Sequence, residues 1–598
     1  MSGRPIVLVT AIFVTLAAIV AACGPAAEPT ATSAPRATAT TAPAATATKP
    51  AEVKNRPLAV LSSPPPNPQA QKGGVFRTLS SEDPPDFGIW DSAVGSTFEV
   101  AIPVTDTLFD RNEFQPGKME ELLPNLAYDW WTDATGEKWT FKLREGAKFH
   151  DGAPFTCADV KFSLEVIRDA RDATGSKLRR SPRGAWLGRV KDIRCPDAST
   201  VEIVTNGPLP SIPATLAVSS FAIMPKHIFE GKLELLIKQA SPGVGAFMFE
   251  SHTTTESVKL KRNPNYWNQP YPYLDGVWVV NVGSNTAMQS AMRVGRAELG
   301  SSSGLFTAGL REQLIAEGKI VVPRKEARDG FNGWQANWTR KPWSDPRFSL
   351  AMRCAIDSKK VIETAENGQT FEGPIFPLAE TPGGSPWAVT KAEWMAVHPC
   401  HGPSGDAANM EKRRQIARDL LKDMGFTAEN PAQPTSYTVG NDQVFIAVLN
   451  DLAQVGINVK FRSVTTNERY NIQTNGETDI LQQGFATSRR DPDHWLYEQY
   501  YSTSDRNYGK YTNPEIDVLI DKQSRTLDVV ERKKTINQIE KMLLRDNAKI
   551  VVRHSLTAPE FASWVKDVYW GEPGNSQNTS VKRARIWIDQ AKMKQVLG

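Results

Sequence analysis

One cluster of residue types in the sequence could bind a metal ion, His398-Pro399-Cys400-His401. Imidazole nitrogen and cysteine sulfur are ligands of soft or borderline ions such as Zn²⁺. No CxxC or HxxxH pattern accompanies the cluster, so a loop closed by a disulfide is favoured over a metal centre. The chain also has no HExxH helix motif and no Walker A loop, and its 7 histidines are scattered. These patterns argue against a secreted hydrolase, so we expect no enzyme activity, no metal and no cofactor.

The clearest local pattern lies in residues 139–164. Trp139, Phe141 and Leu143 alternate with polar residues, which predicts a half-buried strand. Thr156 precedes Asp159 by three residues, as in the capping box at a helix N-terminus. The stretch therefore predicts a strand, a turn and a capped helix.

The same stretch, WTFKLREGAKFHDGAPFTCADVKFSL, resembles the signature of the family 5 extracellular solute-binding proteins of ABC importers, which bind dipeptides, oligopeptides or nickel. It departs from the family pattern mainly at Cys157, where a small residue is usual. Further resemblances follow in order along the chain, among them residues 105–109 (TDTLF), 223–228 (IMPKHI) and 262–267 (RNPNYW). The resemblance runs from residue 72 to the C-terminus, and it identifies the fold and not the ligand.

This resemblance implies an α/β, two-lobe fold like that of periplasmic binding proteins, with a large extra subdomain and a hinge of two chain segments. Residues 416–461 read as two helices and a strand, which agrees with α/β lobes. We expect lobe I at residues 71–324 with the extra subdomain at about 95–245, lobe II at 325–550, and a return to lobe I at 551–598. The two crossings are expected near residues 321–328 and 549–553.

Residues 484–496, GFATSRRDPDHWL, resemble the family's cleft loop. In dipeptide binders the first Asp of that loop pairs with the α-ammonium group of the peptide. Ser488 matches that position, and its neutral hydroxyl cannot replace a charge-assisted bond worth roughly 1.5–3 kcal/mol. Arg489 and Arg490 favour a ligand with acidic or acceptor groups if they face the cleft; the alternative is that both point to solvent. Phe485 in the same loop is a further candidate ligand contact.

Five other residues are candidates for the ligand site. Trp334 and Trp338 share one face in strand geometry, and aromatic walls suit peptides and sugars. Core packing is the alternative for both. Trp387 occupies a position that resembles the family's P-x-x-W near the pocket. Trp90 and Asp86, in the loop after the first predicted strand, are weaker candidates.

The start of the chain has the pattern of a targeting segment in residues 1–22. Val20-Ala21-Ala22-Cys23 resembles a bacterial lipobox, in which Cys23 carries the lipid after cleavage. An uncleaved anchor or a plain secretory signal is the alternative, although the apolar run is short for a transmembrane helix. Residues 23–70, rich in Ala, Thr and Pro, are expected to be a disordered tether. The body would then lie outside the cytoplasm, held at the cell membrane through its lipid anchor only.

The cysteines other than Cys23 are even in number, and an oxidising compartment favours disulfides. Three pairings are possible. We favour Cys157 with Cys195 and Cys354 with Cys400, because each pair stays within one expected lobe. Four buried free thiols are the alternative.

The resemblance implies a lipid-anchored substrate-binding protein of an ABC importer, which captures a peptide or similar small solute by hinge closure and delivers it to the permease. The expected partners are the ligand and the permease and ATPase subunits, and a monomer is expected. The net charge of +4 is small for 598 residues, which gives no reason to expect nucleic acid. The alternative is a binder of a non-peptide ligand (a sugar, an acidic metabolite or a metal complex) in uptake or sensing.

Overall fold

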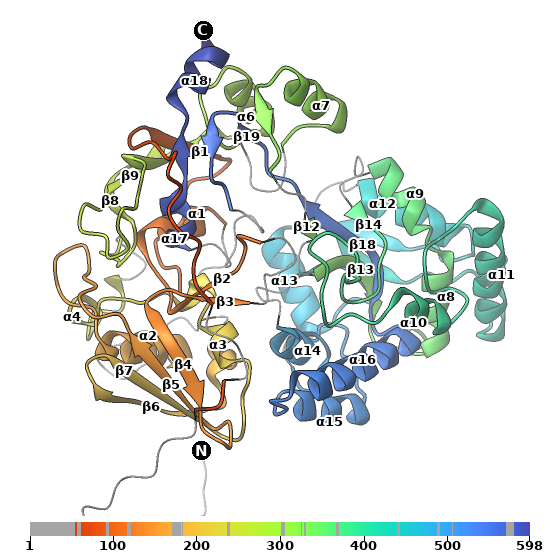
Figure 1. Ribbon diagram of the computed structural model, residues 1–598. Coiled ribbons are helices and arrows are strands. Elements are labelled where there is room, and N and C mark those ends of the chain that lie inside the picture. Colours follow the sequence, from red (N-terminus) through yellow and green to blue (C-terminus); the bar gives the residue numbers. More distant parts are fainter. Residues whose placement is uncertain are drawn as a thin grey trace, which may run out of the picture. The chain divides into compact units, whose positions relative to one another are not determined.

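The computed structural model describes residues 54–56, 61–90, 95–115, 121–169, 181, 183–235, 240–300, 305–323, 326–327, 330–365, 370–438, 443–486, 491–504, 506–569 and 579–598. Helices and strands alternate in two lobes, which we define by their strands (Figure 1). Lobe I holds β1–β11 and β19–β21, and lobe II holds β12–β18. Within the described ranges, no helix combines the length and the apolar character needed to cross a membrane.

Lobe I contains two four-stranded sheets, with strand orders β1-β10-β9-β8 and β4-β5-β7-β6. Its strands are β1 (Val75–Ser80), β2 (Phe109–Arg111), β3 (Leu122–Pro124), β4 (Ala127–Thr132), β5 (Lys138–Leu143), β6 (Val190–Asp197), β7 (Thr200–Thr205), β8 (Phe247–Thr253), β9 (Ser257–Arg262), β10 (Gly276–Asn281), β11 (Ile320–Val321), β19 (Phe561–Ala562), β20 (Val565–Lys566) and β21 (Trp587–Ile588). Each sheet has its own core of buried apolar side chains, so the sheet of β4 to β7 is a separate packing unit within lobe I.

The helices of lobe I are mostly short. They are α1 (Gly95–Val104), α2 (Cys157–Asp169), η1 (Gly184–Leu187), α3 (Ile212–Thr215), η2 (Ser219–Phe221), α4 (Lys226–Phe229), α6 (Asn285–Arg293), α7 (Ala308–Ala316), α17 (Ser580–Arg585) and α18 (Gln590–Leu597). The strand predicted from residues 139–143 is β5, and the predicted helix is α2. The Asp159 carboxylate accepts bonds of 2.9 Å from the N–H and the hydroxyl of Thr156, which is one half of the predicted capping box.

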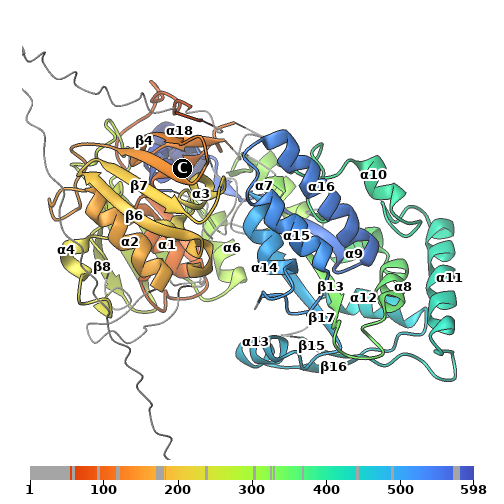
Figure 2. The same cartoon turned by 90° about the horizontal axis from the view of Figure 1, so that it is seen from below.

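Lobe II is built on the sheet β12-β18-β13-β17, to which β14 adds beside β18. Its elements are β12 (Glu326–Ala327), β13 (Gly330–Ala336), α8 (Pro346–Ala355), α9 (Ser358–Ala365), β14 (Thr370–Phe371), α10 (Lys391–Ala396), α11 (Ala407–Asp423), β15 (Thr435–Thr438), α12 (Gln443–Ala453), β16 (Lys460–Ser463), α13 (Thr466–Asn475), β17 (Ile480–Ala486), α14 (Pro492–Tyr500), α15 (Pro514–Gln523), α16 (Val529–Asp546) and β18 (Ile550–Thr557). Helices cover both faces of this sheet: α14 and α16 lie on one face, α8 and α12 on the other (Figure 2).

The chain crosses between the lobes twice, and the two crossings run side by side. β11 pairs with β19 in lobe I, and β12 pairs with the end of β18 in lobe II, both antiparallel. The first crossing therefore lies between β11 and β12, within the expected range. The second lies between β18 and β19, later than the residues 549–553 expected from sequence. Those residues belong to lobe II, where β18 pairs with β13.

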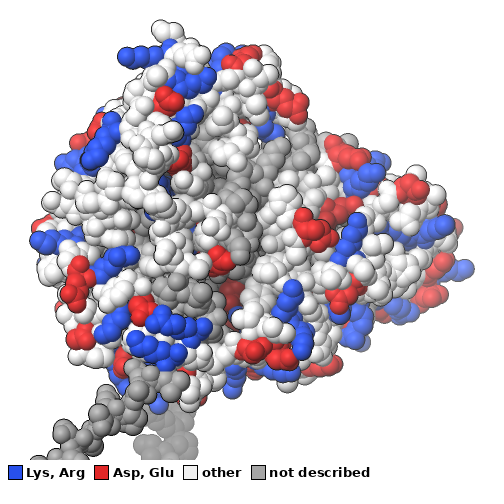
Figure 3. All heavy atoms as spheres, viewed as in Figure 1, with Lys and Arg blue, Asp and Glu red and all other residues white. Residues whose placement is uncertain are grey.

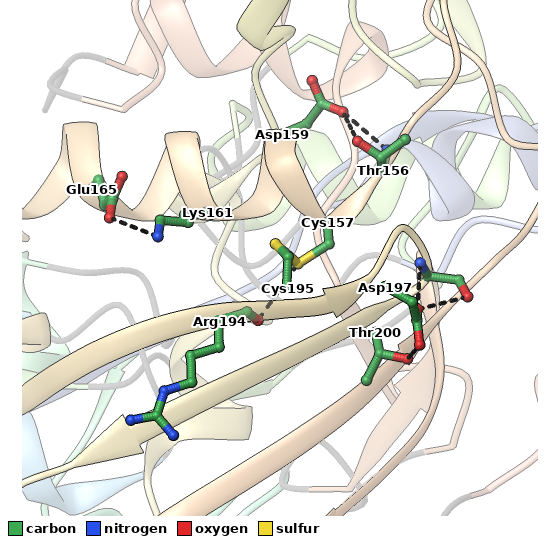
Figure 4. The surroundings of a disulfide bond; sticks show 10 residues. Thr156, Cys157, Asp159, Lys161, Glu165, Arg194, Cys195, Asp197 and Thr200 are labelled. Atoms are coloured by element: carbon green, nitrogen blue, oxygen red, sulfur yellow. Dashed lines mark hydrogen bonds and ion pairs between the residues drawn. A yellow bond between two sulfur atoms is a disulfide. The ribbon is translucent and has the colours of Figure 1, made fainter.

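Both disulfides favoured from sequence are present. Cys157 at the start of α2 bonds Cys195 in β6 with an S–S distance of 2.02 Å, which fastens helix to strand (Figure 4). Cys354 in α8 bonds Cys400 in the loop after α10 at 1.98 Å. Each disulfide joins two segments of one lobe.

Candidate functional site

The loop expected to meet the ligand joins β17 to α14. Ser488, Arg489 and Arg490 lie outside the described residues, as does Cys23. The site is therefore built here from the elements that flank the loop. On the β17 side, the Phe485 ring is 1% exposed and packs on Phe331 with 4.9 Å between ring centroids. In this conformation Phe485 is a core residue of lobe II.

The α14 side of the loop is fixed by Asp491. Its side chain accepts a bond from the N–H of Asp493 and so caps α14. Both of its oxygens also accept bonds from the Arg532 guanidinium, at 2.7 and 2.6 Å. Burial disfavours the carboxylate, but the Arg532 charge outweighs it and lowers the pKa of Asp491 to about 2. Asp491 thus shapes the turn, as its Asp-Pro pattern predicts.

Trp387 lies beside this ion pair. The Arg532 guanidinium is 5.1 Å from the centroid of the Trp387 ring, within cation–π range. The Trp387 side chain is 9% exposed, and its indole N–H has no acceptor among the described residues. Of the predicted aromatic contacts, Trp387 is the one whose side chain adjoins the fixed end of the loop.

The two tryptophans of the β13 region do not share a face, contrary to expectation. Trp334 is 1% exposed and stacks on Phe445 in the core beneath α12. Trp338 follows the end of β13 and packs against the core on the other side of the sheet, with its ring 5.0 Å from that of Tyr511. The strand ends at Ala336, and the Asn337 side chain then accepts a bond from the N–H of Thr339, which turns the chain.

The two lobe I candidates have structural contacts. Trp90 is 3% exposed within the core of the β4 to β7 unit. Asp86 accepts bonds from the N–H of Gly88 at 3.2 Å and from the hydroxyl of Thr97 at 3.3 Å, as in an Asx turn. These bonds order the loop between β1 and α1.

Side chains near the loop also join the two lobes, and sequence reasoning missed them. The Trp186 indole of η1 donates to the Glu498 carboxylate of α14 at 2.6 Å. The Ser211 hydroxyl before α3 donates to Asp493 at 2.9 Å. Burial raises the pKa of Asp493. Trp186, Ser211 and Glu498 have no motif of their own, and the motif that contains Asp493 does not indicate its contact with Ser211. Each contact joins residues 312 or 282 positions apart in the sequence.

The His398–His401 segment contains the disulfide expected there. The sulfurs of Cys354 and Cys400 lie within 4.8 Å of a nitrogen of His398, but the two sulfurs are bonded to each other. The guanidinium groups of Arg353 and Arg413 both donate to the Cys400 carbonyl. A cation here would have to displace the disulfide and lie beside two positive charges.

One motif was overlooked in the sequence. Residues 300–304 read GSSSG, the GxSxG spacing of a hydrolase nucleophile elbow. Such an elbow places the serine between a strand and a helix. Here Leu299 forms isolated bridges, and α7 begins at Ala308. Residues 301–304 lie outside the described residues, and the flanking elements do not fit an elbow.

The charged side chains on the surface do not indicate whether the protein favours an acidic or a basic ligand. On the face shown in Figure 3, basic and acidic side chains are interspersed over both lobes. A groove lined by residues of α10, α15 and α16 contains paired charges, with Lys541 donating to Glu393 at 2.6 Å. None of the predicted site residues lines that groove.

Comparison with known proteins gives consistent matches. The family model for "Bacterial extracellular solute-binding proteins, family 5 Middle" matches residues 121–507. The periplasmic oligopeptide-binding protein OppA of Salmonella typhimurium is 23% identical over 461 residues, which cover 73% of this chain and 80% of that protein. The glutathione-binding protein GsiB of Pectobacterium atrosepticum is 25% identical over 466 residues, covering 74% and 83%.

Solved structures match the fold over most of the chain. The periplasmic binding protein DppA of Helicobacter pylori, in complex with the peptide STSA, has a TM-score of 0.70 at 23% identity and covers 87% of this chain and 99% of that one. The binding protein AgaA from A. tumefaciens R10, in complex with agropinic acid, has a TM-score of 0.68 at 22% identity and covers 86% and 99%.

Proposed function

Because the chain belongs to family 5 of the bacterial extracellular solute-binding proteins, we propose that it is the lipid-anchored substrate-binding protein of an ABC importer. It captures a peptide or a similar small solute between its lobes and delivers the solute to the permease. No covalent chemistry is required for this function. The permease and ATPase subunits are its partners.

The observation that carries this proposal is the hinge. Two antiparallel crossings, paired at β11 with β19 and at β12 with β18, connect two lobes with separate cores. Such a connection lets the lobes rotate while each core stays packed. The names of the relatives, which include oligopeptide-binding and glutathione-binding proteins, support a peptide or peptide-like cargo.

Closure of the hinge is a population shift. A ligand that binds more tightly to the closed form moves the equilibrium toward closure by its difference in affinity for the two states. The bonds from Trp186 to Glu498 and from Ser211 to Asp493 join the lobes without any ligand atom. They add to the stability of the closed form, so the ligand has to supply less of the free energy that favours closure.

A non-peptide, acidic solute is the second candidate. Ser488 replaces the aspartate that pairs with a peptide α-ammonium group in dipeptide binders, and Arg489 and Arg490 follow it. A hydroxyl and two guanidinium groups complement acceptor oxygens better than an ammonium group. A protein with a similar fold, AgaA, was solved in complex with agropinic acid, so this fold can hold an acidic non-peptide ligand.

Native mass spectrometry of the gently purified protein, followed by denaturation and identification of the released molecules, tests the cargo. A series of peptide masses supports the peptide importer. One acidic or sugar species supports the second candidate. A solute turned over to product during incubation would contradict both.

Substitution at Ser488 tests the role of the loop. We expect Ser488→Asp to raise affinity for tri-alanine about 10- to 100-fold, because it restores a charge-assisted bond worth roughly 1.5–3 kcal/mol. Ser488→Asn is the matched control without charge. Titration calorimetry with tri-alanine and with N-acetylated tri-alanine provides the measurement. An equal gain for both peptides would contradict a contact with the amino terminus.

Substitution of Cys23 tests the anchor separately. Cells that express the chain and are fed labelled palmitate should give a labelled, membrane-associated protein. Cys23→Ser should lose the label, and Cys157→Ser should keep it. A labelled Cys23→Ser protein would refute lipidation at this residue.

A further inference from the structure

Three consecutive residues of the N-terminal tether each contact a different residue of β4. Asn55 exchanges backbone hydrogen bonds of 3.0 and 2.9 Å with Thr132. The Arg56 guanidinium donates to both carboxylate oxygens of Asp129, at 2.5 and 3.1 Å. The ammonium group of Lys54 lies 4.0 Å from the centroid of the Trp131 ring. Backbone, charge and aromatic contacts thus all act on one short segment.

The edge of β4 is suited to such a partner. β4 is the outer strand of the sheet β4-β5-β7-β6, so among the strands that the structure describes none pairs with its second edge. An open edge presents unpaired N–H and C=O groups that pair readily with an extended segment. Side chains alternate along the strand: Trp130 points into the lobe I core, and Trp131 points to the opposite face. Trp131 is nevertheless only 4% exposed, and Lys54 lies over it.

The chain between this segment and β1 is also held by lobe I. The Arg585 guanidinium donates to the carbonyls of Pro64 and Pro65, at 2.7 and 3.4 Å. The Asn67 amide donates to the Asp567 carboxylate at 2.8 Å. All of these contacts lie in the range expected from sequence to be a disordered tether. They involve the C-terminal part of lobe I, and no residue of lobe II.

We propose that residues 54–56 are a docking segment for the open edge of β4, and that the tether is attached to lobe I from residue 54 onward. The chain between Cys23 and this segment, residues 24–53, can then span at most on the order of 100 Å, its length at full extension. This consequence for the membrane rests on the lipid anchor of the proposed function, whereas the docking itself does not. An anchored protein would be held through the β4 edge of lobe I, and lobe II would move relative to the membrane when the hinge closes.

Limited proteolysis of the full chain in detergent micelles tests the docking. Trypsin does not cut before proline, so the bonds after Lys49 and Arg56 stay intact. The bonds that it can cut in the tether are Arg36–Ala37 and Lys54–Asn55. We expect the Lys54–Asn55 bond to be cut at least tenfold more slowly than the Arg36–Ala37 bond, as followed by intact mass. Equal rates at the two bonds would overturn the proposal.

Two variants test whether the slow cleavage at Lys54–Asn55 depends on the contact between Arg56 and Asp129. Asp129→Ala removes the partner of Arg56, and it should raise the rate of cleavage at Lys54–Asn55 at least fivefold while cleavage at Arg36–Ala37 stays unchanged. Glu202→Ala removes an ion pair with Lys138 on the same sheet, 3.3 Å long, in which none of residues 54–56 takes part; its cleavage pattern should match that of the unaltered protein. A slow Lys54–Asn55 cut in Asp129→Ala would refute docking through Arg56. None of these outcomes depends on ligand, lipid or permease, so failure here leaves the proposed function standing.

Discussion

Lobe I and lobe II each contain one disulfide, and the two differ in their surroundings more than in the length of chain they close. The sequence separations are 38 and 46 residues, so loop-closure entropy assigns each about 4 kcal/mol of stabilisation. In lobe I, Cys157 is fully buried in the core but Cys195 is exposed, whereas Cys354 and Cys400 of lobe II are both fully buried. The lobe I disulfide therefore fastens an edge strand to a core helix, and the lobe II disulfide lies wholly within a packed core.

Each lobe also contains a fully buried carboxyl group whose pKa is raised to about 8, Asp106 in lobe I and Glu540 in lobe II, and the two groups are held in different ways. Asp106 of lobe I accepts bonds from side chains: Asn125 at 3.2 Å, Tyr266 at 3.2 Å and Trp267 at 3.4 Å. Glu540 of lobe II accepts bonds of 2.8 Å from the backbone N–H groups of Phe376 and Val389. Burial raises the pKa of both groups to about 8 in spite of these donors. The Asn125 amide can turn to offer its oxygen in place of its NH₂ and a backbone N–H cannot, so the two sites should respond differently to the same substitution.

Removal of the disulfides should give the largest effect. Urea unfolding of Cys157→Ala/Cys195→Ala and of Cys354→Ala/Cys400→Ala should show a loss of about 4 kcal/mol in each, from loop entropy. The lobe II pair should lose more, because its missing sulfur atoms leave a cavity in a closed core. An equal or greater loss in the lobe I pair would contradict the comparison.

Amide substitution of the two carboxyl groups should give the next largest effect, a loss of unfolding free energy that differs between the lobes. Glu540→Gln turns an amide NH₂ toward a backbone N–H and leaves a buried donor unpaired, at a cost of about 1–3 kcal/mol. Asp106→Asn should cost less than about 1 kcal/mol at pH 7, because Tyr266 and Trp267 can still donate to its remaining oxygen and the Asn125 side chain can turn its own oxygen toward the new NH₂. Unfolding free energies of both variants at pH 7 provide the measurement. A greater loss for Asp106→Asn would show that the side-chain network is the more rigid one.

The contrast between these carboxyls also marks what the sequence allowed us to predict. Asp106 and Tyr266 lie in two family-like motifs, and their contact explains why both motifs keep polar residues in a core. Glu540 binds main-chain groups, which leave no residue-type pattern, so its role could not be predicted. Strand geometry predicts one face for Trp334 and Trp338, but the strand ends at Ala336, before Trp338, and the sequence does not mark that end. Both faces of the lobe II sheet are buried, so a periodic pattern could not separate core residues from a ligand wall either.

Proton uptake by Asp106 provides a further test. A carboxyl whose pKa rises to about 8 on folding contributes stability that is fully present below its unfolded pKa near 4 and is lost as pH rises to 8. The unfolding free energy of the unaltered protein minus that of Asp106→Asn should therefore fall by about 1.4 kcal/mol per pH unit between pH 5 and 7. The fall should stop above pH 8. A pH-independent difference would mean that Asp106 is ionised in the folded protein.

The contact between the lobes should give the smallest effect, and it should appear in binding and not in unfolding. Trp186→Phe keeps the ring and removes the indole N–H that donates to Glu498 across the lobes. Trp139→Phe is the matched control, because its indole donates to the Leu209 carbonyl at 3.1 Å within lobe I. One such bond is worth about 0.5–1.5 kcal/mol. We therefore expect Trp186→Phe to weaken the affinity for the co-purifying solute by about two- to tenfold, since it destabilises the closed form.

Trp139→Phe should instead lower the unfolding free energy of lobe I and leave the dissociation constant unchanged. Calorimetric titration and urea unfolding of both variants measure the two quantities on the same samples. If both variants lose stability and neither loses affinity, the Trp186 bond persists when the lobes separate and belongs to the packing of the folded chain. If Trp186→Phe alone loses affinity, the bond forms on closure, and residues far from the ligand share in setting how tightly it is held.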